Sequence, residues 1–504
     1  MAADAIEVER KYSPSESDAL PPLASIPGVD RAGQPVNEML DAVYFDTKAL
    51  ALARQRITLR RRSGGPDAGW HLKLPVAVGE RREIREPLGG DQDAVPENLR
   101  QLVLVHTRCH ELVPVAHIRT SRRLTPLYAA DGAVLANFSD DRVEAQSLLT
   151  RAGPSRWREW ELELADGPRR LLQDADALCA AEGVTIATHP FKLARALGPD
   201  YPENPGAAPK PDPSGPASDV MLSYVSQQVR AVKLNDPRVR VDAPDAVHQF
   251  RVAARRLRSA LATFRTLTDT TSARFLRGEL QWLAGNVGQA RDAEVIRARL
   301  KDMISAEPPE LLIGPVARKI QEHLGTVQQQ GRAAGLAALD STRYFRLLDA
   351  LDAFLAVPPL SGGAGNDALG TVGRLVSAER KRLKAAVRSL DGAGGTPPDA
   401  ALHEVRKAAK RLRYAAEAAT PIFGTQATNV ARAAEGIQEI LGDFQDSVVT
   451  RETLLVLAGQ AADGPGSGFT FGRLHALEQQ RGNQARLRFY DAWQQSRPKP
   501  LRWA

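Results

Sequence analysis

Acidic and basic residues alternate near the start of this 504-residue chain. The segment EVERK places Glu7, Glu9 and Lys11 two residues apart. Because alternate side chains of a β-strand point to the same side of the sheet, these three groups share one face. Carboxylates bind divalent cations, and ammonium groups bind phosphate. A solvated strand face would explain this segment by itself, so the interpretation depends on whether the pattern recurs.

Charged residues recur with the same period of two in other segments of the N-terminal part. They are Arg60, Arg62, Lys73, Arg81, Glu83, Arg85, Arg119, Arg123, Glu159, Glu161 and Glu163. So many charges of one phase would be costly against an apolar core. In a closed barrel they line a polar interior, and the apolar residues of the opposite phase face outward. Acidic and basic strands around one interior have the composition of a metal–phosphate site.

Alternating apolar patterns predict the strands that carry these charges, at residues 5–12, 42–47, 57–62, 69–75, 80–88, 133–141 and 157–165. Glycine and proline separate the segments, and residues 168–183 predict a helix that ends at Gly183. Residues 1–200 are therefore predicted to form an antiparallel β-rich domain. Residues 201–217 are rich in proline and glycine and predict a linker. From residue 218 to 504 the apolar period is 3.6, which indicates an all-α bundle.

The helical part contains the same motif twice. HQFRVAARRLR begins at His248 and HEVRKAAKRLR begins at His403, an offset of 155 residues. Asp292 and Asp446 follow the two motifs at an offset of 154 residues. Two ordered motifs at one shared offset indicate an internal duplication.

Each motif stacks cations on one helix face at spacings of three and four residues. The two stripes are His248, Arg251, Arg255 and Arg258, and His403, Arg406, Lys410 and Arg413. Like charges at these spacings repel by roughly 0.2–0.5 kcal/mol per pair on an isolated helix. A solvated face explains a single charge run, but the repetition favours an anion site. The histidines fit either phosphate donors or partners of Asp292 and Asp446.

The composition restricts the partners. Aromatic residues make up only 5% of the chain, too few to favour base stacking, so a bare phosphate chain fits better than nucleic acid. No segment has the length of a membrane span, and the acidic N-terminus lacks the apolar stretch of a secretory signal. The two cysteines have no metal-type spacing and are expected to be reduced in the cytoplasm.

These motifs resemble two known families. The ExExK segment, followed by YFDT, LRRR, HLK, ELEL and HPFKLARAL, is similar to the CYTH superfamily of triphosphate tunnel metalloenzymes. The two histidine-led repeats resemble the CHAD domain. The resemblance implies an eight-stranded antiparallel β-tunnel that hydrolyses triphosphates with Mg²⁺ or Mn²⁺, followed by a helical domain linked to polyphosphate binding.

The resemblance also implies roles for single residues. Glu7, Glu9, Glu161 and Glu163 match metal-binding positions, although three alternating glutamates allow a shift of the second pair by two. Lys11 and Tyr44 match a dyad proposed to orient or deprotonate water. The positions that match phosphate-binding residues are Arg60, Arg62, Lys73, Arg119, Arg123 and Lys192. An acidic residue is also expected on the ANFSDD strand, and strand phase does not choose between Asp140 and Asp141. Thr58 stands where some members carry an acid.

We therefore expect a metal-dependent triphosphatase joined to a polyphosphate-binding module, in the cytoplasm or at polyphosphate granules. Phosphoryl transfer needs positioned charges more than covalent catalysis, which agrees with the lack of a recognisable nucleophilic triad. The alternatives are a non-catalytic polyphosphate scaffold, a cyclase acting on ATP, and an RNA-binding protein. Phosphate release in the presence of Mg²⁺ distinguishes an enzyme from a scaffold.

Overall fold

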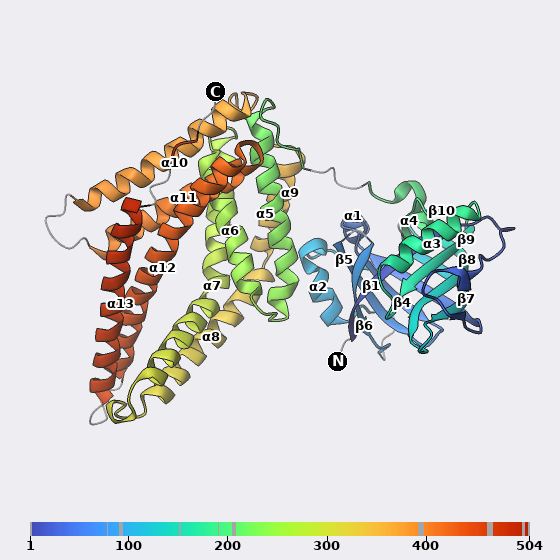
Figure 1. Ribbon diagram of the computed structural model, residues 1–504, viewed down its shortest axis with the longest axis horizontal. Helices are drawn as coiled ribbons and strands as arrows, with labels where there is room; N and C mark the ends of the chain where they lie inside the picture. Colours follow the sequence, from blue (N-terminus) through green and yellow to red (C-terminus); the bar gives the residue numbers. More distant parts are fainter. Residues whose placement is uncertain are drawn as a thin grey trace. The chain divides into compact units, whose positions relative to one another are not determined.

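The chain divides into two compact units, Met1–Ala207 and Ala208–Ala504 (Figure 1). The structure is a computed structural model, and it describes residues 3–77, 79–89, 94–150, 153–189, 191–203, 208–391, 398–460, 467–495 and 499–501. Among these residues, no helix combines the length and the apolar character that crossing a lipid bilayer requires.

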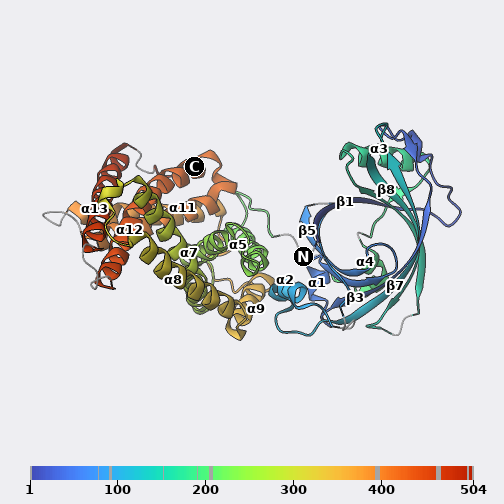
Figure 2. The ribbon, with the colours of Figure 1, turned by 90° about the horizontal axis from the view of Figure 1, so that it is seen from below.

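The first unit is a closed antiparallel barrel of eight strands, as predicted (Figure 2). Around the barrel the strands follow the order β1 (Ala3–Ser13), β6 (Glu80–Glu86), β5 (Gly69–Ala77), β4 (Thr58–Ser63), β3 (Val36–Asp46), β7 (Val113–Tyr128), β8 (Val134–Ser147) and β9 (Ser155–Leu164). Pairing between β1 and β9 closes the ring. The short strands β2 (Arg31–Ala32) and β10 (Thr185–Ile186) pair with β7 and β1.

Apolar side chains of the strands face outward and pack under helices. Trp160 and Leu162 of β9 pack with Leu171 of helix α3 (Arg170–Ala181). On another side of the barrel, residues of β4 and β5 pack with helices α1 (Ala51–Arg54) and α2 (Glu97–Thr107). Because alternate residues point to opposite faces, this outer packing directs the charged residues of the same strands inward.

One end of the barrel interior is apolar and is filled by helix α4 (Lys192–Leu197). Leu193 and Leu197 of α4 pack against inward-facing residues such as Ile118 and Val143. In Figure 2, α4 lies within the ring of strands. The helix therefore closes this end and places its first residue, Lys192, beside the polar part of the interior.

The second unit is helical, and its order of helices repeats. Within the described residues, two sets of four helices, α5–α8 and α10–α13, are separated by α9. Their bounds are α5 (Ala217–Arg240), α6 (Ala246–Thr263), α7 (Thr270–Ala306), α8 (Val316–Leu339), α9 (Thr342–Ala356), α10 (Ala368–Asp391), α11 (Asp399–Phe423), α12 (Thr425–Gln460) and α13 (Ser467–Gln495). The motif helices α6 and α11 hold the same place in each set and pack against each other. The two cationic stripes therefore meet inside this unit.

Candidate functional site

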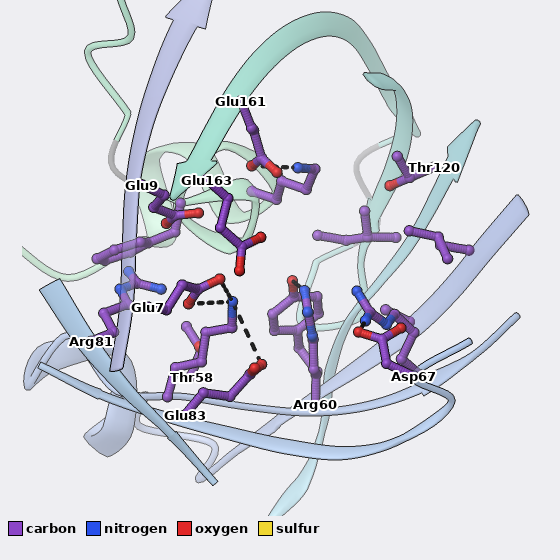
Figure 3. A pocket seen from close by; sticks show the side chains of 18 of the residues that line it. Glu7, Glu9, Thr58, Arg60, Asp67, Arg81, Glu83, Thr120, Glu161 and Glu163 are labelled. Atoms are coloured by element: carbon purple, nitrogen blue, oxygen red, sulfur yellow. Dashed lines mark hydrogen bonds and ion pairs between the residues drawn. The ribbon is translucent and has the colours of Figure 1, made fainter. Parts of the chain in front are cut away.

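A polar cavity occupies the barrel interior, and most strands contribute charged side chains to it (Figure 3). Its lining includes most of the tunnel residues expected from the sequence, namely Glu7, Glu9, Lys11, Tyr44, Arg60, Arg62, Lys73, Glu161, Glu163 and Lys192. Three further cations line it as well, Arg81, Arg85 and Arg122. The alternation in the sequence thus corresponds to one shared interior.

The pairing of β1 with β9 sets the acidic side of the cavity. Glu9 lies opposite Glu163, and Lys11 lies opposite Glu161. Lys11 forms ion pairs with both Glu161 and Glu9. Although burial opposes it, these two carboxylates raise the pKa of Lys11 above its usual value. Lys11 therefore stays protonated, so it can orient a ligand but cannot accept a proton.

Glu163 is the carboxylate of this wall that lacks a cationic partner. No hydrogen bond or ion pair of its side chain occurs within the described residues, and Figure 3 shows it pointing into the cavity beside Glu7 and Glu9. Burial and the carboxylates of Glu7 and Glu9 raise the pKa of Glu163 to about 7. Negative charge is thus under-compensated at this point, as expected of a site that receives a cation.

A second group of acidic residues surrounds the side-chain ammonium group of Lys192. The carboxylates of Asp141, Glu159 and Glu161 offer oxygens that all lie within 4.8 Å of one another. Lys192 Nζ lies 2.9 Å from Asp141, 2.6 Å from Glu159 and 2.7 Å from Glu161. Lys192 thus compensates part of the charge of this group, and Arg122 pairs with Asp141 and Glu161 as well. A buried acidic cluster able to bind a metal is nevertheless present.

The basic side of the cavity contains two guanidinium groups without a carboxylate partner within the described residues. Arg60 donates to the Tyr44 hydroxyl at 3.3 Å, and its buried Nε has no hydrogen-bond acceptor. Arg81 stacks on Phe191 at 3.6 Å, and its Nη2 is buried without an acceptor. Lys73 and Arg62, by contrast, pair with Glu7 and Asp67. Arg60 and Arg81 therefore keep buried donors that no acceptor among the described residues uses.

Tyr44 shares this environment. Burial raises the pKa of a phenol, but here Arg60 and the more distant Lys192 outweigh that effect and lower the pKa of Tyr44. Lys11 and Tyr44 therefore differ in what they can do. Lys11 keeps its proton and can only donate hydrogen bonds, whereas Tyr44 is the member of the expected dyad that is shifted toward losing its proton.

Strand β7 turns the other set of alternate residues toward the cavity from the set that contains Arg119 and Arg123. Arg119 is exposed and pairs with Asp41 outside the cavity, and Arg123 is exposed as well. The residue that faces inward is Arg122, which binds Asp141 at 2.7 Å and Glu161 at 2.7 Å. Thr120 and Ile118, at the same phase as Arg122, also line the cavity. Sequence reasoning missed Arg122 because IRTSRRL contains arginines of both phases.

The choice between Asp140 and Asp141 follows from the neighbouring strand in the same way. Asp140 pairs with Arg158 at 2.7 Å, and Arg158 also donates to the backbone of the segment after β1. Asp141 is fully buried and faces Arg122 and Lys192. Asp141 is therefore the acidic residue of β8 that joins the tunnel.

In the helical unit, four cations of the two stripes converge where α6 meets α11. Arg251, Arg255, Arg406 and Lys410 are partly buried near one another; we call them the core cluster. Arg251 pairs with Asp292 at 2.7 Å, but the buried Nε atoms of Arg255 and Arg406 have no acceptor among the described residues. Burial and the three arginines lower the pKa of Lys410 to about 7.

Two glycines that sequence reasoning did not single out lie beside this cluster, and one of them, Gly288, leaves room for Arg251. Arg251 donates to the Gly288 carbonyl at 3.0 Å, and a Cβ at Gly288 would lie only 2.8 Å from the guanidinium carbon. Gly442, 154 residues later in α12, lies beside Arg406. Both glycines fall at the offset that relates Asp292 to Asp446, so the repeat itself was the signal that could have identified them.

The remaining stripe residues lie outside the core cluster. His403 contacts Gln445 at 2.6 Å rather than Asp446, and His248 is exposed near the start of α6. Arg413 binds Glu417 at 2.8 Å and Glu435 at 2.9 Å, so two carboxylates surround its charge. Arg258 instead contacts the neutral side chain of Gln281 at 3.1 Å.

Comparison with known proteins identifies both units. The CYTH domain family matches residues 5–185, and the CHAD domain family matches residues 223–455. Two Mycobacterium tuberculosis proteins, both named uncharacterized, are Rv2226 of strain H37Rv and MT2285 of strain CDC 1551. Each is 42% identical over 486 residues, which cover 94% of this chain and 93% of the relative. The solved CHAD domain from the plant Ricinus communis is 24% identical, with a TM-score of 0.47, covering 60% of this chain and 100% of that one.

The placement of strand β7 gives a prediction about stability. Replacing Arg122 with Gln leaves the buried carboxylates of Asp141 and Glu161 under-compensated, which should lower the free energy of unfolding by roughly 3 kcal/mol. The matched change Arg123→Gln alters an exposed side chain and should cost less than about 0.5 kcal/mol. Urea unfolding followed by tryptophan fluorescence measures both. Equal effects would contradict this placement of Arg122.

Proposed function

The chain belongs to the family of proteins that join a CYTH domain to a CHAD domain, and on this premise we propose that it hydrolyses inorganic triphosphate or related polyphosphate in the tunnel and binds polyphosphate through the helical unit. CYTH proteins are phosphoryl-transfer enzymes that depend on a metal ion. The observation that carries the proposal is the distribution of unpaired charge. Glu163 faces the cavity without a cation, and Arg60 and Arg81 line the same cavity without an anion, among the residues that the structure describes.

The metal would be Mg²⁺ or Mn²⁺, held by Glu7, Glu9 and Glu163 with Glu161 at the edge of the site. Hard divalent cations prefer carboxylate oxygens. Burial and the neighbouring Glu7 raise the pKa of Glu163, and a cation bound there would offset this effect. When bound, the metal offsets negative charge on the phosphate oxygens. This set of four glutamates corresponds to the one expected from the sequence.

The cations of the chain would hold and orient the phosphate chain. Arg60 and Arg81 offer guanidinium groups whose donors are not used by carboxylates of the described chain. Such donors become more favourable as charge develops on the equatorial oxygens of the phosphoryl group being transferred. Lys73, now paired with Glu7, is a further donor once Glu7 turns to a metal.

Hydrolysis requires that water bond to phosphorus while the bond to the bridging oxygen breaks. The attacking water must then lose a proton. Tyr44 is the tunnel residue suited to accept it, since Arg60 favours the phenolate, whereas Lys11 is kept protonated by Glu9 and Glu161. We therefore assign Lys11 to orienting the water or the substrate and Tyr44 to the proton transfer.

In the helical unit the core cluster would bind polyphosphate. Its four cations are only partly balanced by Asp292 and Asp446, and burial makes the excess costly in the absence of an anion. A phosphate chain supplies repeated negative charge without a requirement for aromatic stacking. Binding of this kind would also concentrate the enzyme at polyphosphate deposits.

A change in the proposed metal site tests catalysis. Glu9→Gln keeps the shape of the side chain but removes a carboxylate charge, so phosphate release from triphosphate with Mg²⁺ should fall at least about a hundredfold. Glu144→Gln is the matched control, because Glu144 pairs with Arg156 on the outside of the barrel. Long-chain polyphosphate and ATP, each with Mg²⁺, Mn²⁺ or chelator, define the substrate range. No release from any of them would favour the non-catalytic scaffold.

The core cluster gives a prediction about pH. Free Lys410 loses its proton near pH 7, but a bound anion favours the charged form, so binding above this pH must take up one proton. Affinity for long-chain polyphosphate should therefore fall about fivefold between about pH 7 and 8, approaching tenfold per unit at higher pH. Lys410→Arg keeps its charge and should remove most of this dependence. A wild-type affinity that is flat across this range would contradict the role of Lys410.

A further inference from the structure

The two halves of the helical unit differ in charge at equivalent positions. Arg258 and Arg413 occupy the same place in their motifs, 155 residues apart. Two carboxylates, Glu417 and Glu435, bind Arg413. Both acids are absent from the first repeat, where their counterparts are Ala262 and Gln281. Among the described residues, the hydrogen-bond partner of the Arg258 side chain is therefore the neutral amide of Gln281, at 3.1 Å.

A second arginine strengthens this difference. Arg277 of α7 is exposed and lies near both Arg258 and Arg411, and its counterpart in the second repeat is Ala431. Arg411 shares the buried carboxylate of Glu379 with Arg382. The group around Arg277 therefore contains four guanidinium groups and one carboxylate, which leaves a net positive charge.

This group adjoins the core cluster along both motif helices. Arg255 and Arg258 are three residues apart on α6, a rise of about 4.5 Å, and Lys410 and Arg411 are consecutive on α11. No such continuation exists past Arg413 in the described chain, because Glu417 and Glu435 lie there. An anionic chain that leaves the core cluster meets net positive charge in one direction. In the other direction Glu417 and Glu435 balance the charges of Arg413 and Arg256.

We propose that the polyphosphate site extends in one direction only, from the core cluster to an outer phosphate subsite formed by Arg258, Arg277 and Arg411. The expected role of Arg413 is reassigned accordingly, from ligand binding to an ion-paired position. This inference rests on the proposed binding of polyphosphate by the helical unit. It adds that only a chain long enough to pass the core cluster reaches the outer subsite.

Exchanging the residues that distinguish the two repeats tests the asymmetry. Gln281→Glu places the acid of the second repeat beside Arg258, and Glu435→Gln makes the reverse change beside Arg413. Long-chain polyphosphate is titrated into the full chain with EDTA present, at several salt concentrations. Gln281→Glu and Arg277→Gln should each weaken binding several-fold and make the salt dependence shallower by about one phosphate contact. Glu435→Gln and Arg413→Gln should not weaken it.

The possible results distinguish the outer subsite from the underlying proposal that the helical unit binds polyphosphate. Equal losses for Arg277→Gln and Arg413→Gln would overturn the asymmetry, and wild-type binding by Gln281→Glu and Arg277→Gln would overturn the outer subsite. If replacement of all four core residues by Gln leaves affinity and salt dependence unchanged, polyphosphate binding at the core cluster itself is wrong. Circular dichroism establishes that each variant retains its helices, so that a loss of binding reports on charge.

Discussion

The pairing of β1 with β9 is the interaction on which the tunnel depends. It closes the ring, and its register places Glu9 opposite Glu163 and Lys11 opposite Glu161. Buried like charges on adjacent strands are unfavourable unless cations compensate them. Lys11, Lys192 and Arg122 form ion pairs with Glu161, whereas Glu163 forms no ion pair within the described residues and is compensated only in part, by Lys73. The closed barrel thus leaves one carboxylate that an added cation would balance.

The same constraint acts in the helical unit with the opposite sign. Packing of α6 against α11 brings two cationic stripes together, and the aspartates of α7 and α12 compensate them only in part. Among the described residues of the tunnel, the groups without an ion pair are an acid, Glu163, and two arginines, Arg60 and Arg81. Such a site can bind a cation and an anion together. In the helical unit they are cations alone, which suits an anion without a metal. The chemistry proposed for each unit follows from the sign of the charge left unbalanced.

Much of the architecture was predictable from local pattern. Period-two alternation identified most of the barrel strands. Strand β7, the longest of the described strands, was recognised only through its central segment IRTSRRL. The histidine-led motifs, at an offset of 155 residues, identified the duplication from sequence alone. These predictions were possible because strand phase and helix periodicity depend on residues that are close together in the sequence.

What the sequence determined by itself is the inventory of charged groups, the faces they share and the repeat that doubles them. Tertiary structure alone decided which of these charges are neutralised. Arg122 rather than Arg119 or Arg123 enters the tunnel, because the outer packing of the barrel fixes the phase of β7. Asp141 rather than Asp140 does so for the same reason. Arg258 and Arg413 have the same motif position but different partners, since those partners come from other helices or another turn. Charge compensation joins residues far apart in the chain, and local pattern carries no information about it.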